Sequence, residues 1–215
     1  MQISKLAAIE NKPGKFTVSF TDGTDIIVSA AQIADFGLYS GLELPENEYG
    51  KLVNDLKLGS ARARAIRILG SRNLSSHEIG KRLVSKGESA GIAQETVKWL
   101  EDIGAINDPE YAGQIVRHYS AKGFGLARIR DELFRRGIPR ELWDEALTFL
   151  ERPEDSETAE DAVQIFLDRK LRGSTDKDEL RRAADALCRR GFSYEDAKSA
   201  VNRYVLRVSA ENAEE

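Results

Sequence analysis

The stretch LFRRGIPRELWDEAL at residues 133–147 returns in altered form as LCRRGFSYEDAKSAV at residues 187–201. A shorter version, LVSKG, stands at residues 83–87. The match between the first two copies extends upstream, because YAGQIVRHYSAKG at 111–123 aligns with DAVQIFLDRKLRG at 161–173 through a shared Ala-x-Gln-Ile and a final glycine. Three related copies in one chain predict an internal structural repeat.

The second helix of each copy has a start, a core face and an end. Leu126, Ile129 and Leu133 recur at helical spacing and predict one apolar face. Ser75 followed by Glu78 predicts a capping box at the start of the earlier copy. Each helix is expected to end at a glycine, which adopts the left-handed backbone conformation at low cost. These helix stops are Gly87, Gly137 and Gly191.

A third helix is expected just after each glycine. Pro139 suits a first helical turn, and Ser193 followed by Glu195 and Asp196 supplies a cap and early acids. The inward-facing apolar positions agree between the two later copies: Ile138, Trp143, Ala146, Leu147 and Leu150 correspond to Phe192, Ala197, Ala200, Val201 and Tyr204. Each unit is therefore predicted to hold three helices.

One such unit is too small to be stable alone, so we expect the units to stack and to cover each other's apolar faces. The predicted fold class is mainly α, with three tandem three-helix, helix-turn-helix-like repeats that form an elongated curved array after a small β-rich module. The predicted domains are an N-terminal module at 1–59, repeat one at 60–106, repeat two at 107–152, repeat three at 153–208 and a tail at 209–215.

The N-terminal module has the pattern of a small sheet. In residues 16–20, apolar side chains alternate with Thr and Ser, which is typical of a half-buried strand. The pair Asp22-Gly23 predicts a two-residue hairpin turn before the returning strand. Residues 3–9 are expected to add a third strand, and Ser29 to cap a short helix. β structure is expected only in the first thirty residues.

Composition sets limits on the class of protein. The chain has 215 residues, of which 41% are hydrophobic and 32% charged, with a net charge of −4. No apolar run reaches the roughly 20 residues of a membrane-spanning helix, and the N-terminus lacks the apolar core of a signal peptide. We therefore expect a cytoplasmic globular protein with no membrane partner. The one cysteine, Cys188, is predicted to be buried and inert.

The sequence has no recognisable catalytic or metal-binding constellation. His77 and His118 have no Cys, His or paired acid at metal-ligand spacing, and no phosphate-binding loop or nucleophile elbow is present. We therefore predict a protein that is not an enzyme and that has no cofactor and no small-molecule substrate.

Two basic stretches, at 62–86 and 117–140, stand out in an acidic chain. The first candidate partner-binding patch is Arg117, Lys122, Arg128, Arg130, Arg135, Arg136 and Arg140. The second is Arg64, Arg67, Arg72, Lys81, Arg82 and Lys86. A simpler interpretation of the basic residues before each glycine is that cations stabilise a helix C-terminus by roughly 0.3–1 kcal/mol each. For Arg189 and Arg190, which lie among acids, this interpretation is favoured.

Arg128 and Arg135 are seven residues apart on one helix. They are expected to share a face opposite the apolar stripe, so that reversing both charges would test binding without disturbing the core. Other functions also fit three-helix units. One alternative is a helix-turn-helix transcription regulator that binds nucleic acid, and another is a helical scaffold for protein interactions. The basic stretches also allow weak, salt-sensitive contact with single-stranded DNA.

Three segments in succession carry a resemblance to a known family. They are SSHEIGKRLVSKG, then VKWLEDIGAINDPEYA, then GFGLARIRDELFRRGIPRELWDEAL. In this order they resemble the RecX regulatory proteins, bacterial modulators of the recombinase RecA. The resemblance covers residues 60 to about 206 and is most specific at Asp108-x-x-Tyr111-Ala112 and at the spaced Gly125, Ile129, Leu133 and Gly137.

The resemblance implies a regulator that binds the RecA filament on single-stranded DNA. It further implies that the protein inhibits filament growth, ATP hydrolysis and strand exchange, in the setting of DNA repair, homologous recombination and the SOS response. No residue-level contact motif transfers from the family. The candidate site residues therefore rest on charge clustering.

Overall fold

The computed structural model describes residues 1–70, 72–151 and 153–214. The side chains of 151, 153–158 and 212–214 are outside the description. The chain divides into two compact units, the first of Met1–Gly70 with Leu83–Lys98, and the second of Ser71–Arg82 with Trp99–Glu215. Each unit has its own core.

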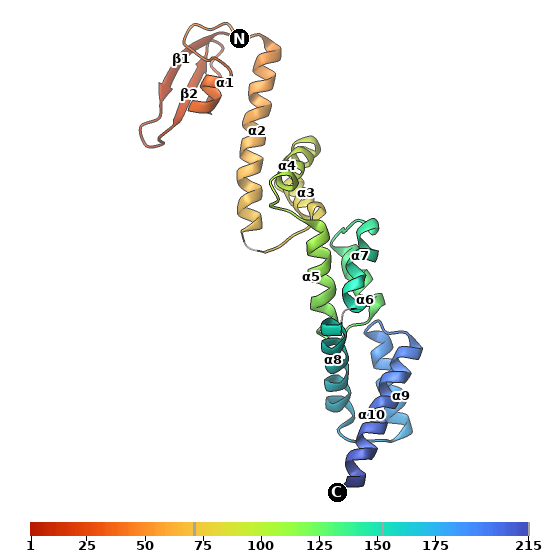
Figure 1. Ribbon diagram of the computed structural model, residues 1–215. Helices are drawn as coiled ribbons and strands as arrows, with labels where there is room; N and C mark the ends of the chain where they lie inside the picture. Colours follow the sequence, from red (N-terminus) through yellow and green to blue (C-terminus); the bar gives the residue numbers. More distant parts are fainter. Residues whose placement is uncertain (71, 152, 215) are drawn as a thin grey trace. The chain divides into compact units, whose positions relative to one another are not determined.

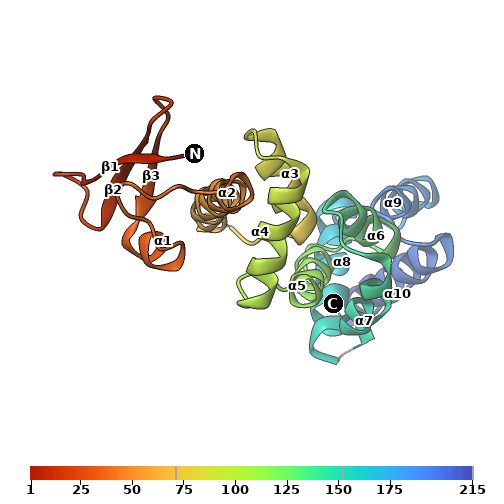
Figure 2. The ribbon, with the colours of Figure 1, turned by 90° about the horizontal axis from the view of Figure 1, so that it is seen from above.

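A three-stranded antiparallel sheet begins the first unit. Its strands are β1 (Ile3–Ala8), β2 (Lys15–Phe20) and β3 (Asp25–Ser29), paired in the order β1-β2-β3. Helix α1 (Ala30–Asp35) follows β3 directly and lies beside the sheet (Figure 2). Ser29 caps α1 in a capping box with Gln32, so the predicted cap is confirmed.

Two predictions about this sheet need correction. The β2–β3 hairpin has a three-residue loop, because Gly23 N donates to Phe20 O and Phe20 N donates to Thr24 O. Gly23 takes a φ of 90°, which gives a tight turn followed by a left-handed residue in place of the two-residue turn. The extended structure also continues past residue thirty, because Gln2 pairs with Glu43 in an isolated bridge.

Helix α2 (Glu46–Leu69) is long (Figure 1), and its side chains contribute to two apolar cores. Its first half brings Leu52 into the sheet core, where the Tyr49 ring meets the Phe20 ring edge-on at 5.3 Å. Farther along, Leu58 and Ala61 pack with Ile92. The predicted boundary between residues 59 and 60 thus lies inside a continuous helix. The division of the chain into the predicted domains stays a prediction.

The remaining helices follow the predicted order. They are α3 (Ser76–Ser85) and α4 (Ala90–Asp102), then α5 (Asp108–Ser120), α6 (Leu126–Arg135) and the segmented helix η1 (Arg140–Leu142), α7 (Trp143–Leu147) and η2 (Thr148–Glu151), then α8 (Pro153–Leu171), α9 (Lys177–Arg189) and α10 (Tyr194–Glu214). In the described part of 60–206 no strand occurs. The mainly α fold is confirmed, and α10 extends into the predicted tail.

The helices of repeats two and three belong to the second unit (Figure 1), and each of the two repeats encloses an apolar cluster. Ile129 and Leu133 are buried in the cluster of repeat two, and Leu187 and Tyr204 in that of repeat three. Leu126, in contrast, is 41% exposed, so its predicted place in the core was wrong. The stacking of all three repeats into one elongated array stays a prediction.

The predicted helix signals are confirmed. Gly87, Gly137 and Gly191 have φ of 95°, 66° and 95°, in the left-handed region. Ser75 and Glu78 form the capping box at the start of α3. Ser193 accepts a hydrogen bond from Asp196 N at the start of α10.

Candidate interaction surface on repeats two and three

The sequence Arg-Arg-Gly occurs at the turn between the second and third helices of repeats two and three, and we call it the RRG turn. In repeat three this turn packs on the start of α6. Gly125 N donates to Arg190 O at 3.0 Å, and Ala127 N donates to Gly191 O at 3.1 Å. The first amide groups of a helix have no partner within it. The carbonyl groups of the RRG turn supply that partner.

The Arg190 side chain joins the same two repeats. Its guanidinium lies 4.2 Å from the centre of the Phe166 ring and 5.1 Å from that of Phe124. It also donates to the carbonyl of Gly123 at 3.2 Å. Burial lowers the pKa of this guanidinium below its usual range. Arg190 therefore makes contacts beyond the end of its own helix, and its stabilisation of that helix C-terminus stays a prediction.

The RRG turn of repeat two makes the matching contact with the start of α3. Ser75 donates from its hydroxyl to Arg136 O, and the His77 side chain packs against Gly137, where a Cβ atom would collide with it. The repeated phrase thus marks the surface by which each later repeat contacts the second helix of the repeat before it.

Arg136 lies in a partly buried polar network. It donates to Glu132 at 2.9 Å and to the Tyr111 hydroxyl. Burial alone would raise the pKa of the Glu132 carboxyl, but hydrogen bonds from Tyr119 and Arg136 and the charges of Arg136 and Arg135 hold it below its ordinary value. The Arg136 side chain is therefore held by contacts within repeat two.

Replacing Glu132 with glutamine is expected to lower the free energy of unfolding by about 1 kcal/mol at pH 7, because it removes the charge that Arg136 faces. The pKa of Glu132 is depressed in the folded state. Its stabilisation is therefore present above the unfolded value of about 4.3 and is lost as pH falls through the folded value. Urea unfolding at pH 7 and pH 3 should show that the difference in free energy of unfolding between the wild type and the variant is smaller at pH 3. A gap that stays constant would contradict this assignment.

Two more members of the first patch are engaged within the fold. The Arg117 guanidinium lies 4.4 Å from the centre of the Phe149 ring. Arg128 lies against Gly191, where a Cβ atom would be 2.5 Å from its backbone nitrogen. This contact is made by the backbone and Cβ of Arg128, which a change to glutamate would keep, so the expectation that its charge can be reversed without disturbing the core stays a prediction.

The exposed members of the first patch are Lys122, Arg130, Arg135 and Arg140. Phe134 lies between Arg130 and Arg135 in the sequence, and 66% of its surface is exposed. This residue was not among those predicted from the sequence, although its position next to the buried Leu133 places it off the apolar face of α6. Arg135 pairs with Glu132 at 3.6 Å, and the Arg140 guanidinium lies 5.7 Å from the centre of the Trp143 ring.

The second patch divides between the two units. In the first unit, Arg64 donates to Lys86 O at 2.9 Å and pairs with Glu88 at 3.1 Å, so it caps the end of α3. Arg67 bonds to the carbonyl of Ala63, and the side chain of Lys86 is exposed.

In the second unit, Arg72 lies 3.8 Å from Glu78, Lys81 is exposed, and Arg82 is half-buried with a partner of its own. Among the described residues, Lys81 is thus the member of this half of the patch whose side chain is exposed and makes no ion pair or hydrogen bond. That the six residues of this patch act together stays a prediction.

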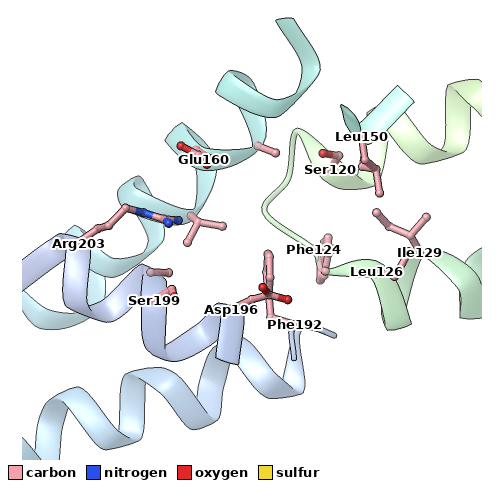
Figure 3. Close-up of a pocket in the computed structure, with 14 residues that line it drawn as sticks. Ser120, Phe124, Leu126, Ile129, Leu150, Glu160, Phe192, Asp196, Ser199 and Arg203 are labelled. Atoms are coloured by element: carbon pink, nitrogen blue, oxygen red, sulfur yellow. The ribbon is translucent and has the colours of Figure 1, made fainter. Parts of the chain in front are cut away.

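A pocket of about 440 Å³ lies between repeats two and three (Figure 3). Its lining is mostly apolar and includes Phe124, Leu126, Ile129, Leu150, Val163 and Phe192. Glu160, Asp196 and Arg203 also line it. Figure 3 shows Phe124, Leu126 and Ile129 on one side and Asp196, Ser199 and Arg203 on the other. Sequence patterns did not indicate this pocket, because turns and helices of two repeats form it together.

Cys188 is half-buried against the core of repeat three, and so less buried than predicted. Among the described residues, no group of three His, Cys, Asp or Glu side chains could hold a metal ion. The His118 ring instead meets the Tyr119 ring at 5.4 Å. None of the helices in the part of the chain that the structure covers is long and apolar enough to cross a membrane.

Comparison with known proteins places the repeats in a family. The regulatory protein RecX of Xanthomonas axonopodis pv. citri is 33% identical over 138 residues, which are 64% of this chain and 83% of that protein. The chain belongs to the RecX family. Regulatory protein RecX of Streptomyces coelicolor is 34% identical over 158 residues, 72% of this chain and 81% of its own.

Solved RecX structures share the fold. A crystal structure of regulatory protein RecX matches with a TM-score of 0.72 at 22% identity, covering 94% of this chain and 98% of its own. The RecX structure from Lactobacillus salivarius matches with a TM-score of 0.60 at 19% identity, covering 70% and 97%. The family model of the second three-helix domain of RecX matches residues 107–147, which contain the first RRG turn.

Proposed function

We propose that this RecX-family protein is a non-enzymatic regulator that binds the RecA filament on single-stranded DNA in the cytoplasm. It slows growth of the filament, ATP hydrolysis and strand exchange. The observation that carries this proposal is the similarity to regulatory protein RecX of Xanthomonas over 83% of that protein's length. The family resemblance of the sequence supports RecA as the partner.

The contact surface that we propose is the exposed part of the first patch, together with Phe134. Arg130 and Phe134 are one helical turn apart on α6, and both are exposed. An exposed aromatic ring with arginines around it is the composition that dominates the energy of protein interfaces. The exposed Asp131 lies among these arginines and would repel phosphate groups. The surface therefore suits protein better than a DNA backbone.

The packing gives no support to a helix-turn-helix reader of duplex DNA. Such readers place the first residues of the recognition helix against base edges. In α6 the backbone amides of Gly125 and Ala127 instead donate to the RRG turn of repeat three. The start of this helix therefore packs on a neighbouring repeat, although Leu126 and Ala127 keep exposed side chains.

Co-sedimentation with RecA filaments tests the proposal. RecA assembled on single-stranded DNA with a slowly hydrolysed nucleotide should carry the protein into the pellet. Naked single-stranded DNA and duplex DNA, at the same salt concentration, should bind it at least tenfold more weakly. The purified protein alone should neither hydrolyse ATP nor cleave DNA. Tight binding to one duplex sequence without RecA, combined with no binding to filaments, would favour a transcription regulator and contradict the proposal.

A further inference from the structure

The pocket between repeats two and three has an apolar interior that the described chain leaves unfilled. Leu126 has the helical spacing of a core residue, yet it is 41% exposed because it faces this pocket. Phe124, Val163 and Phe192 add further apolar surface. Leaving such surface in water costs roughly 25 cal/mol per Å². A ligand that covers it would therefore gain affinity.

The two walls of the pocket are fixed to each other. Phe124 and Leu126 flank Gly125, whose amide donates to Arg190 O, and the Arg190 guanidinium lies over the Phe124 ring. Phe192 follows Gly191, whose carbonyl accepts from Ala127 N. A pocket with walls held in place before binding loses little conformational entropy when it is filled.

The size and polarity of the pocket favour a protein side chain as its occupant. Small-molecule sites usually bring a few buried polar groups together around the ligand. Here the one strongly buried polar residue in the lining is Ser120, and the charged residues Glu160, Asp196 and Arg203 are exposed. About 440 Å³ is ample for one Phe, Leu or Met side chain and part of its neighbour.

The charged residues at the pocket determine which kind of residue can lie beside that side chain in the partner. Two carboxylates, Glu160 and Asp196, stand against one guanidinium, Arg203. Asp196 accepts a hydrogen bond from the Ser193 hydroxyl at 2.6 Å. This excess of negative charge repels a phosphate backbone and attracts a cation.

We propose that this pocket anchors one large apolar side chain of RecA, with a lysine or arginine beside it in the RecA sequence that pairs with Glu160 and Asp196. The proposal rests on the proposed function and names a second point of contact, distinct from the arginine surface of α6. The pocket exists only where repeat three packs on repeat two.

Two variants test the pocket, each with a matched control. Ser199→Trp fills the pocket from an exposed position on α10, and Ser209→Trp makes the same change on the same helix outside it. Glu160→Lys reverses a charge at the pocket, and Glu101→Lys does so at an exposed site on α4. Circular dichroism verifies that all four proteins are folded.

The readout is affinity for RecA filaments on single-stranded DNA, measured by fluorescence anisotropy of the labelled protein. Ser199→Trp and Glu160→Lys should each weaken binding about fivefold, with both controls within twofold of the wild type. If the wild type binds filaments but the pocket variants bind as tightly as the controls, the proposed role of the pocket is wrong and the proposed function still stands. A wild type that ignores filaments would overturn the proposed function itself. Weaker binding of Ser199→Trp to naked single-stranded DNA would show that nucleic acid, not RecA, fills the pocket.

Discussion

Replacing Gly191 with alanine should lower the free energy of unfolding by about 3 kcal/mol, while the same change at Gly87 should cost about 1 kcal/mol. Both glycines end a second helix with a φ of 95°, so both variants suffer the same backbone strain. At Gly191 the new Cβ would also lie 2.5 Å from the backbone nitrogen of Arg128, whereas no described atom lies within 4 Å at Gly87. The difference isolates the contact between repeats two and three.

Urea unfolding followed by circular dichroism measures both losses. The Gly191 variant should also unfold in two steps, because repeat three loses its support from repeat two. Equal losses at the two glycines would mean that the RRG turn serves only to end its own helix. In that case the carbonyl contacts with Gly125 and Ala127 would be incidental to the stability of the fold.

The second large effect concerns binding. Reversing Arg130 and Arg135 to glutamate should weaken affinity for the RecA filament about thirtyfold, or roughly 2 kcal/mol. Both side chains are exposed and flank Phe134, so the change inverts the charge around the ring without removing core contacts. The stability of α6 should fall by no more than about 1 kcal/mol. The circular dichroism spectrum should stay native.

The matched control reverses Arg182 and Arg189 on α9, which are also exposed and change the net charge by the same amount. These two arginines lie among Asp178, Glu179 and Asp185 and should matter much less. If both double variants lose affinity equally, net charge rather than a defined surface governs binding. Phe134→Ala should then be tested, because an aromatic anchor predicts a further loss that does not depend on salt.

The sequence predicts the helices well because each relies on local signals. Helical spacing finds the buried Ile129 and Leu133, and the left-handed preference of glycine finds the ends at Gly137 and Gly191. These properties depend on a few neighbouring residues along the chain. These signals do not depend on the tertiary arrangement of the helices.

The roles of the arginines could not be predicted in this way. Periodicity shows that Arg136 and Arg190 lie off the core face, but not what lies beyond that face. Arg136 meets Tyr111 from another helix, and Arg190 meets Phe124 and the carbonyl of Gly123 from another repeat. One signal was local: Glu132 stands four residues before Arg136, the spacing of a helical ion pair.

The exposed and recessed surfaces were the hardest to foresee. Leu126 belongs to the apolar stripe by spacing, and only the packing of repeat three shows that it faces a pocket. Phe134 looks like a core residue by type, and only its angle from Leu133 on α6 indicates that it faces solvent. Both residues break the expected pattern of burial, and both lie on surfaces that we assign to binding.

The most direct test of the account is the rate of ATP hydrolysis by RecA on single-stranded DNA as this protein is added. We expect the rate to fall progressively, with the full effect reached at or below one molecule of the protein per RecA, and no hydrolysis by the protein alone. The Arg130→Glu/Arg135→Glu variant should need about thirtyfold more protein for the same effect, as its affinity predicts. A rate that stays constant up to equimolar wild-type protein would contradict the central claim that this protein regulates the RecA filament.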